Sequence, residues 1–302
     1  MNTIYWLALV FTPGIGSVTT RKLLDRFGDI ESIFDASPEE IASIPRISLS
    51  TAQTLLSTPF EQLEAELLSL NDEGVDVLTW DDDQYPDNLL ALNDAPGVLF
   101  SRGSILPADS QAVGIVGTRQ PSEQAVNFAQ TLGRKLAERG LTVISGLAVG
   151  VDTAAHQGAL VTQKGRTIAV LGSGIRVIHP SSNTQLAEKI VYHGALLSEV
   201  HPNAPPRGPQ LMARDRIISG LSQAVIVVEA SVNSGSLDTA ARAKKQKRPV
   251  YAVPGSSGTD VLLKKGAQQI LLGMVDFDSL AEEILESPVC NTRSTPTQGR
   301  LF

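Results

Sequence analysis

The fold of this chain is decided by residues 145–156, SGLAVGVDTAAH, which join an apolar run to an alanine-rich helical pattern. The apolar run before them, Leu141 to Ile144, is typical of a buried strand. A second segment of this kind, Ser234 to Ala240, follows the apolar run from Ala224 to Glu229. Small residues at such turns let a ligand approach the backbone, and the N–H groups that open a helix carry partial positive charge. The two turns predict a site for an anion, most often a phosphate.

Apolar runs alternate with helical patterns along most of the chain. The predicted strands are Val75–Trp80, Pro96–Phe100, Ala112–Val116, Leu141–Ile144, Thr167–Leu171, Ala195–Leu197, Ala224–Val228 and Val250–Val253. Apolar strands that alternate with helices indicate an α/β protein whose mostly parallel sheet is covered by helices on both faces. Ligands of such sheets bind at the carboxyl ends of the strands, where both glycine-containing turns fall.

The first part of the chain has a helical pattern. Pro13-Gly14-Ile15-Gly16 between two helical stretches predicts a small all-α, helix-hairpin-helix (SAM-like) domain, and a fainter copy at 44–48 lacks both glycines. Hairpins of this kind contact a nucleic-acid backbone through their N–H groups, but a packing or partner-binding role is the alternative. We expect a helical domain over 1–60, an α/β domain over 61–286 and a disordered Ser/Thr/Pro-rich tail over 287–302.

Charge divides the chain unevenly around a net value of −7. Residues 1–100 carry 4 basic and 17 acidic residues, whereas residues 101–302 carry 21 basic and 15 acidic residues. The anion site therefore falls in the positive part, and the acidic front part should repel nucleic acid. A single cysteine excludes an internal disulfide, and no apolar run is long enough to predict a membrane span. The expected compartment is the cytoplasm, with no membrane partner.

The candidate phosphate-binding residues lie in five segments placed near strand ends, with one addition from a basic cluster at the end of a helix. They are Gly117, Thr118, Arg119, Ser145, Gly146, Gly172, Arg214, Arg216, Ser234, Gly235, Ser236 and Lys244. Arginine forks and free N–H groups suit phosphate oxygens. The alternative is that the glycines only allow tight turns, that the arginines form structural ion pairs, and that the lysine complements a helix dipole.

Several other kinds of site are poorly supported by the sequence. Gly172-Ser173-Gly174 lacks the third glycine of a dinucleotide-binding turn, and no Walker lysine pattern occurs, so we expect no cofactor. Asp152 and His156 share a helical face, but no nucleophile motif accompanies them. We expect Asp152 to cap its helix and His156 to pack and form hydrogen bonds. The remaining histidines are scattered, so no metal site is expected.

The ordered series of motifs resembles the DprA/Smf family of DNA-processing proteins. The most specific segments are Arg216–Ser222, Val227–Ala230, Ser234–Leu237 and Ala252–Gly255, together with 115–119 and 145–152. The resemblance implies an extended Rossmann-like domain behind the helical one, and a homodimer that binds single-stranded DNA. It also implies loading of a RecA-type recombinase in natural transformation, without enzymatic activity. Phosphates would meet Arg119, Ser145–Gly146, Arg214–Arg216 and Ser234–Ser236.

The chain departs from the family pattern around this pocket. Val149 and Asp215 stand where arginine and asparagine are usual, and Asp238 replaces an apolar residue. Such changes should lower affinity for DNA and flatten its salt dependence, or retune the pocket for a smaller ligand. The C-terminal winged helix of many members is not expected here. A nucleotide sensor or a LOG-like nucleoside-monophosphate enzyme is the alternative, although the glutamate of that chemistry is missing. A third possibility is an adaptor that binds a protein through the acidic front.

Overall fold

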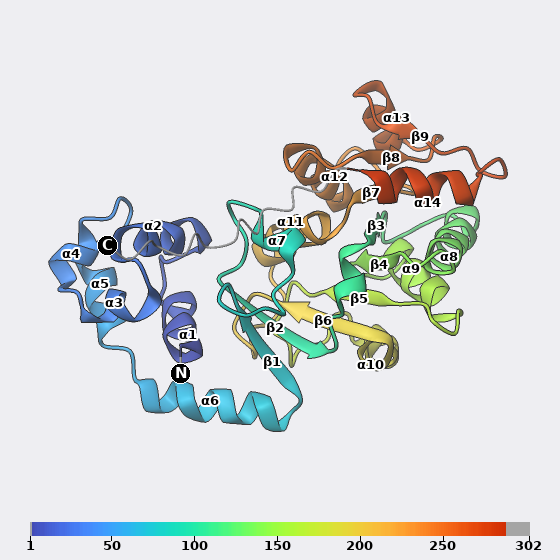
Figure 1. The fold of residues 1–302 in the computed structure, drawn as a ribbon. Coiled ribbons are helices and arrows are strands. Elements are labelled where there is room, and N and C mark those ends of the chain that lie inside the picture. Colours follow the sequence, from blue (N-terminus) through green and yellow to red (C-terminus); the bar gives the residue numbers. More distant parts are fainter. Residues whose placement is uncertain (1, 288–302) are drawn as a thin grey trace, which may run out of the picture.

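A nine-stranded sheet forms the centre of the computed structural model, which describes residues 2–287 (Figure 1). The strands are β1 (Val75–Thr79), β2 (Val98–Gly103), β3 (Ala112–Val116), β4 (Thr142–Ser145), β5 (Thr167–Val170), β6 (Gly194–Ser198), β7 (Ala224–Val227), β8 (Val250–Ala252) and β9 (Gln268–Gln269). Their order is β1-β2-β6-β5-β4-β3-β7-β8-β9. All pairs from β6 to β9 are parallel, while β2 and then β1 extend one edge by antiparallel pairing. The predicted mostly parallel, Rossmann-like sheet is confirmed.

Helices cover both faces of the sheet. They are α1 (Thr3–Phe11), α2 (Ser17–Phe27), α3 (Ile30–Asp35), α4 (Pro38–Ala42), α5 (Leu49–Leu56), α6 (Phe60–Asp72), α7 (Asp87–Leu90), α8 (Glu123–Ala137), α9 (Val151–Leu160), α10 (Thr184–His193), α11 (Gly208–Leu221), α12 (Gly235–Lys245), α13 (Ser257–Lys264) and α14 (Phe277–Glu286). Successive residues of a strand point to opposite faces. Thus Val113 and Ile115 of β3 pack with α8, α9 and α14, while Ala112 and Val116 share a core with α7, α11 and α12.

The front helices share a core with the antiparallel edge of the sheet. Trp6 of α1 is buried and its Nε1 donates to Asp81 Oδ2 at 2.7 Å. The Arg21 guanidinium of α2 lies 4.4 Å from the centre of the Trp80 ring. Gly28 is the C-cap of α2, with a positive φ, and Ser37 forms a capping box with Glu40 at the start of α4. Helix α1 therefore packs against the antiparallel edge of the sheet, and Arg21 of α2 reaches the Trp80 ring beside it.

Two features of the fold differ from the sequence-based expectations. The segment Arg214–Arg216, expected near a strand end, lies inside helix α11. Strand β9 was not predicted, because its two exposed glutamines carry no apolar pattern. The expected tail beyond Ser287 lies outside the described residues. Among residues 2–287, no helix combines the length and the apolar composition that crossing a membrane requires.

Candidate functional site

A cavity of about 500 Å³ opens at the carboxyl ends of β3 and β7. These strands are neighbours, but the chain leaves β3 toward β4 on one side and returns later to β7 on the other. Such a switch point leaves a crevice in which α/β sheets bind ligands. The lining residues come from four segments: Val116, Gly117, Thr118 and Arg119; Ala148 and Asp152; Leu211, Met212, Arg214, Asp215 and Ile218; and Ser231, Asn233, Ser234, Gly235, Ser236, Asp238 and Thr239.

The loop after β3 and the turn after β7 supply the groups that suit an anion. Arg119 is exposed, and within the described part of the chain its guanidinium makes no hydrogen bond or ion pair. Ser234 caps helix α12: its Oγ accepts from the Ser236 backbone N at 3.4 Å and lies 2.7 Å from the Ser236 Oγ. The first turn of an eleven-residue helix therefore opens on the same cavity as a free cation, an arrangement that attracts phosphate.

Helix α11 forms the opposite wall, through residues spaced on one helical face. Leu211, Arg214, Asp215 and Ile218 follow the positions i, i+3, i+4 and i+7. Arg214 is buried, and its Nη1 donates to the carbonyl of Gly146 at 2.7 Å and to the carbonyl of Val170. Its Nε lies 3.2 Å from Asp215 Oδ1. Arg214 therefore ties the α11 wall to the ends of β4 and β5, and its donors are largely used within the protein.

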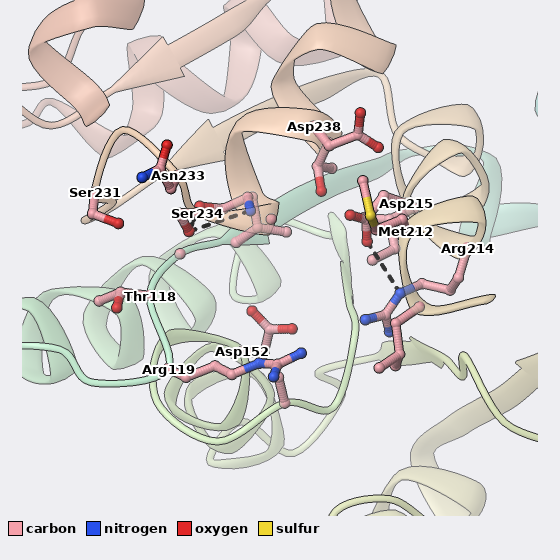
Figure 2. A pocket seen from close by; sticks show the side chains of 18 residues that line it. Thr118, Arg119, Asp152, Met212, Arg214, Asp215, Ser231, Asn233, Ser234 and Asp238 are labelled. Atoms are coloured by element: carbon pink, nitrogen blue, oxygen red, sulfur yellow. Dashed lines mark hydrogen bonds and ion pairs between the residues drawn. The ribbon is translucent and has the colours of Figure 1, made fainter. Parts of the chain in front are cut away.

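Three carboxylates oppose the two guanidinium groups that line the cavity. Asp152 is buried and accepts from the Gly146 backbone N at 3.0 Å; burial raises its pKa, against the attraction of Arg214. Burial also raises the pKa of Asp215 to about 7, with the charges of Asp152 and Asp238 acting in the same direction. Asp238 Oδ2 lies 3.2 Å from Arg242 Nε. Figure 2 shows the Asp152 and Asp215 carboxyl groups turned toward the space above Arg119.

The structure brings seven of the twelve predicted residues to this cavity. They are Gly117, Thr118, Arg119, Arg214, Ser234, Gly235 and Ser236. Ser145 and Gly146 lie behind it: the Ser145 Oγ donates to the Ile115 carbonyl at 2.6 Å, and a Cβ at Gly146 would lie 2.3 Å from Arg214 Nη1. A Cβ at Gly172 would lie 2.8 Å from the Leu211 Cα, so this glycine lets α11 approach the sheet.

Arg216 and Lys244 lie away from the cavity. Arg216 is two residues from Arg214 on α11, so the two side chains leave the helix about 200° apart. Its Nη1 and Nη2 each donate to Glu199 at 2.6 Å, which is the structural ion pair that formed the alternative expectation. Lys244 lies in the last turn of α12, and its Nζ donates to the Lys265 carbonyl at 2.6 Å. The opposite end of this helix opens on the cavity.

Sequence reasoning missed part of the lining. Leu211, Met212 and Ile218 were overlooked because their segment was not interpreted as a helix, although Pro209 in its first turn was a usable signal. Asp152 does not cap α9, whose N-cap is Gly150, but binds the loop before it. The prediction for His156 is confirmed: it is buried with its Nδ1 2.7 Å from Thr167 Oγ1, and burial lowers its pKa to about 3.

These features define a class of protein. It is an α/β protein that has a ligand crevice at the switch point of its sheet and helix-hairpin-helix elements before the sheet. The chain belongs to the DNA recombination-mediator protein A family, which it matches over residues 76–283. Residues 7–58 match the SAM-like helix-hairpin-helix tandem. The DprA/Smf resemblance is therefore confirmed.

Relatives of known name cover most of the chain. Protein Smf of Synechocystis is 35% identical over 282 residues, which are 88% of this chain and 70% of that protein. The structure of DNA processing protein A from Streptococcus pneumoniae aligns with a TM-score of 0.78 at 32% identity, covering 89% of this chain and 94% of that one. A structure described as showing the single-stranded DNA binding mode of the Helicobacter pylori protein aligns with a TM-score of 0.61 at 30% identity, covering 70% and 95%.

Proposed function

We propose that this protein binds single-stranded DNA, with the sugar–phosphate backbone held at the switch-point cavity. The observation that carries the proposal is the meeting of an exposed guanidinium, Arg119, with the first turn of α12 at one opening. Both groups attract phosphate without reading a sequence. The single-stranded DNA named for the Helicobacter pylori relative supports the choice of ligand.

We further propose that the bound strand is delivered to a RecA-type recombinase, as in natural transformation. The family description, DNA recombination-mediator protein A, supports a mediator that binds DNA without transforming it chemically. In this proposal the protein acts in the cytoplasm as a homodimer, so that two cavities hold one strand. The acidic front helices would stay clear of the strand because their charge repels phosphate.

The carboxylates of the cavity limit the strength of this binding. Asp152, Asp215 and Asp238 bring three acidic groups to a site with two guanidinium groups, and those of Arg214 are largely engaged. Electrostatic gain per strand is therefore small. We expect moderate affinity with a shallow dependence on salt, because few counterions are released for each cavity that is filled.

Fluorescence anisotropy with a labelled dT oligonucleotide tests the first part of the proposal. We expect saturable binding at micromolar protein in about 50 mM salt, weaker binding in about 200 mM salt, and little binding to a duplex of equal length. Absence of any binding to dT at micromolar protein and low salt would exclude the proposed function.

Strand exchange in the presence of a single-strand-binding protein tests the second part. A RecA-type recombinase is excluded from DNA covered by such a protein, and a mediator should restore its filament. We expect restoration with the wild type and a matching loss with Arg119→Ala. Restoration that is unaffected by this substitution would separate the mediator activity from the cavity.

One observation favours the LOG-like alternative, in which a nucleoside monophosphate is hydrolysed. Asp215 combines burial, a raised pKa and a place in the cavity wall, which are properties of a general acid. Free base released from nucleoside monophosphates, and lost in Asp215→Asn, would establish this activity. We expect none, because Asp215 Oδ1 is held by Arg214 and no glutamate follows the Ser234–Ser236 turn.

A further inference from the structure

The cavity has an apolar wall that the binding of a backbone phosphate does not require. A phosphate group is satisfied by the free cation and the first helical turn, yet the wall contributed by α11 is built mainly from Leu211, Met212 and Ile218, with Val116 beside them. Met212 is 54% exposed, so an apolar surface reaches the opening. A volume of about 500 Å³ lies in the range of pockets that hold a whole small molecule. Apolar walls of this kind fit the faces of a nucleobase.

The two kinds of surface lie on opposite sides of the cavity. Figure 2 shows the polar side chains of Thr118, Ser231 and Asn233 on one side, and Met212 with Asp215 on the other. A nucleotide with its phosphate at the Ser234 turn would therefore direct its base toward α11. The dimensions and the division of the lining both suit this orientation.

Asp215, on the α11 wall of the cavity, carries a carboxylate oxygen that is not used as a hydrogen-bond acceptor by the described residues. The residue is 7% exposed, and its Oδ1 accepts from Arg214 Nε at 3.2 Å. Within residues 2–287, no hydrogen bond reaches its Oδ2, and the carboxyl group is turned into the cavity (Figure 2). A carboxylate oxygen that faces the cavity without a protein donor is an available acceptor, so the site is complementary to an N–H group. The exocyclic amino group of cytosine is a donor of this kind, whereas uracil and thymine carry an oxygen there.

We propose that one base of the bound strand enters the cavity along α11, and that Asp215 selects cytosine over uracil or thymine through its amino group. The inference rests on the proposed single-stranded DNA binding and adds to it a specificity-determining residue. A protein that held only the backbone would bind these pyrimidines equally.

Oligonucleotides dC12 and dU12 provide the sharpest test, because their bases differ only in the amino or oxo group and in the ring proton that accompanies it. At pH 8, where Asp215 is largely ionised, we expect the wild type to bind dC12 about five- to tenfold more tightly than dU12. In Asp215→Asn the preference for dC12 should be lost or reversed, because the amide oxygen that accepts from Arg214 leaves the NH2 group facing the base, where it can donate to the oxo group of uracil. The asparagine oxygen can still accept from Arg214, so the fold should be kept.

Asp238→Asn is the matched control, since it makes the same chemical change in the same cavity. Asp238 Oδ2 is engaged by Arg242, and Figure 2 shows its carboxyl group turned away from Asp215. We expect tighter binding of both oligonucleotides with the preference for dC12 unchanged. Equal binding of dC12 and dU12 by the wild type, or a preference that survives in Asp215→Asn, would overturn the inference and leave the proposed function standing. Failure of the wild type to bind either oligonucleotide would overturn both.

Discussion

Replacing Asp215 by asparagine tests whether the cavity carboxylates oppose the binding of DNA. A sphere of 500 Å³, the volume of the cavity, has a radius of about 5 Å, so a phosphate near its centre lies about this far from the carboxylate. Two like charges at this distance repel by about 3 kcal/mol at an effective dielectric constant of 20, and by about 1 kcal/mol in water. Since the cavity is open to solvent, we expect Asp215→Asn to bind a dT oligonucleotide about five- to tenfold more tightly at pH 8.

The charge of Asp215 also makes the affinity for DNA depend on pH. Burial and the charges of Asp152 and Asp238 bring the pKa of Asp215 to about 7, while Arg214 acts in the opposite direction. Asp215 is therefore mostly ionised at pH 8 and mostly protonated at pH 6. Wild-type affinity for dT should thus rise as the pH falls from 8 to 6.

Anisotropy titrations of wild type and Asp215→Asn at pH 6, 7 and 8 and constant ionic strength provide the measurement. The two proteins should differ most at pH 8 and converge at pH 6. A constant difference at all three values would show that the charge of Asp215 is not what the substitution removes. Equal affinities at pH 8 would place the phosphate outside the cavity.

Three further predictions concern residues that stabilise the fold outside the cavity. Gly146→Ala should lower the free energy of unfolding by about 3 kcal/mol or more in urea denaturation, because its Cβ would lie 2.3 Å from the buried Arg214 guanidinium. Arg216→Ala should lower the free energy of unfolding by about 3–5 kcal/mol, because it leaves the half-buried Glu199 without its partner. Replacing both residues by apolar ones should restore part of that free energy. His156→Gln should unfold with a weaker dependence on pH: burial holds the wild-type pKa near 3, so the His156 contribution to stability is lost as the pH falls from 6.5 toward 3, by about 1.4 kcal/mol for each pH unit.

Each of these measurements has a clear contrary result. Gly208→Ala is the control for Gly146→Ala, since nothing lies within 4 Å of a Cβ added at Gly208 and its backbone is not left-handed. Equal stability of the two alanine variants would show that the close contact between residue 146 and Arg214 does not matter. If Arg216→Ala kept its stability but lost DNA binding, Arg216 would be a DNA-binding residue and not part of a structural ion pair. A wild-type and His156→Gln pair with parallel pH profiles would mean that His156 does not titrate on unfolding.

The sequence predicts the sheet well because burial on both faces leaves a strong local signal. Six strands of the parallel part, including Ala112–Val116, appear as largely apolar runs, and each occurs in the structure. The turns at 145–150 and 234–236 were also recognisable, because glycine and serine mark the end of a strand and the start of a helix. These local signals were sufficient to place the anion site at the carboxyl edge of the sheet.

The sequence could not assign the arginines, because their roles depend on the rotation of a helix. Helix α11 is buried on most sides, so its hydrophobic pattern has no clear period, and the segment Arg214–Arg216 lacks a helical signature. Once it is helical, Arg214 and Arg216 leave opposite sides and meet different partners. Lys244 shows the same limit, since it shares helix α12 with Ser236 but lies near the other end, about 12 Å away along the axis.

Salt-dependent affinity of Arg119→Ala, compared with Lys244→Ala, tests most directly whether the cavity grips the strand. Both substitutions remove one exposed positive charge, but only Arg119 lines the cavity. If the cavity grips the strand, Arg119→Ala should bind dT at least tenfold more weakly and lose about 0.7 from the slope of log affinity against log salt, while Lys244→Ala should change little. Equal losses in the two variants, or a larger loss in Lys244→Ala, would move the binding surface to the far end of α12.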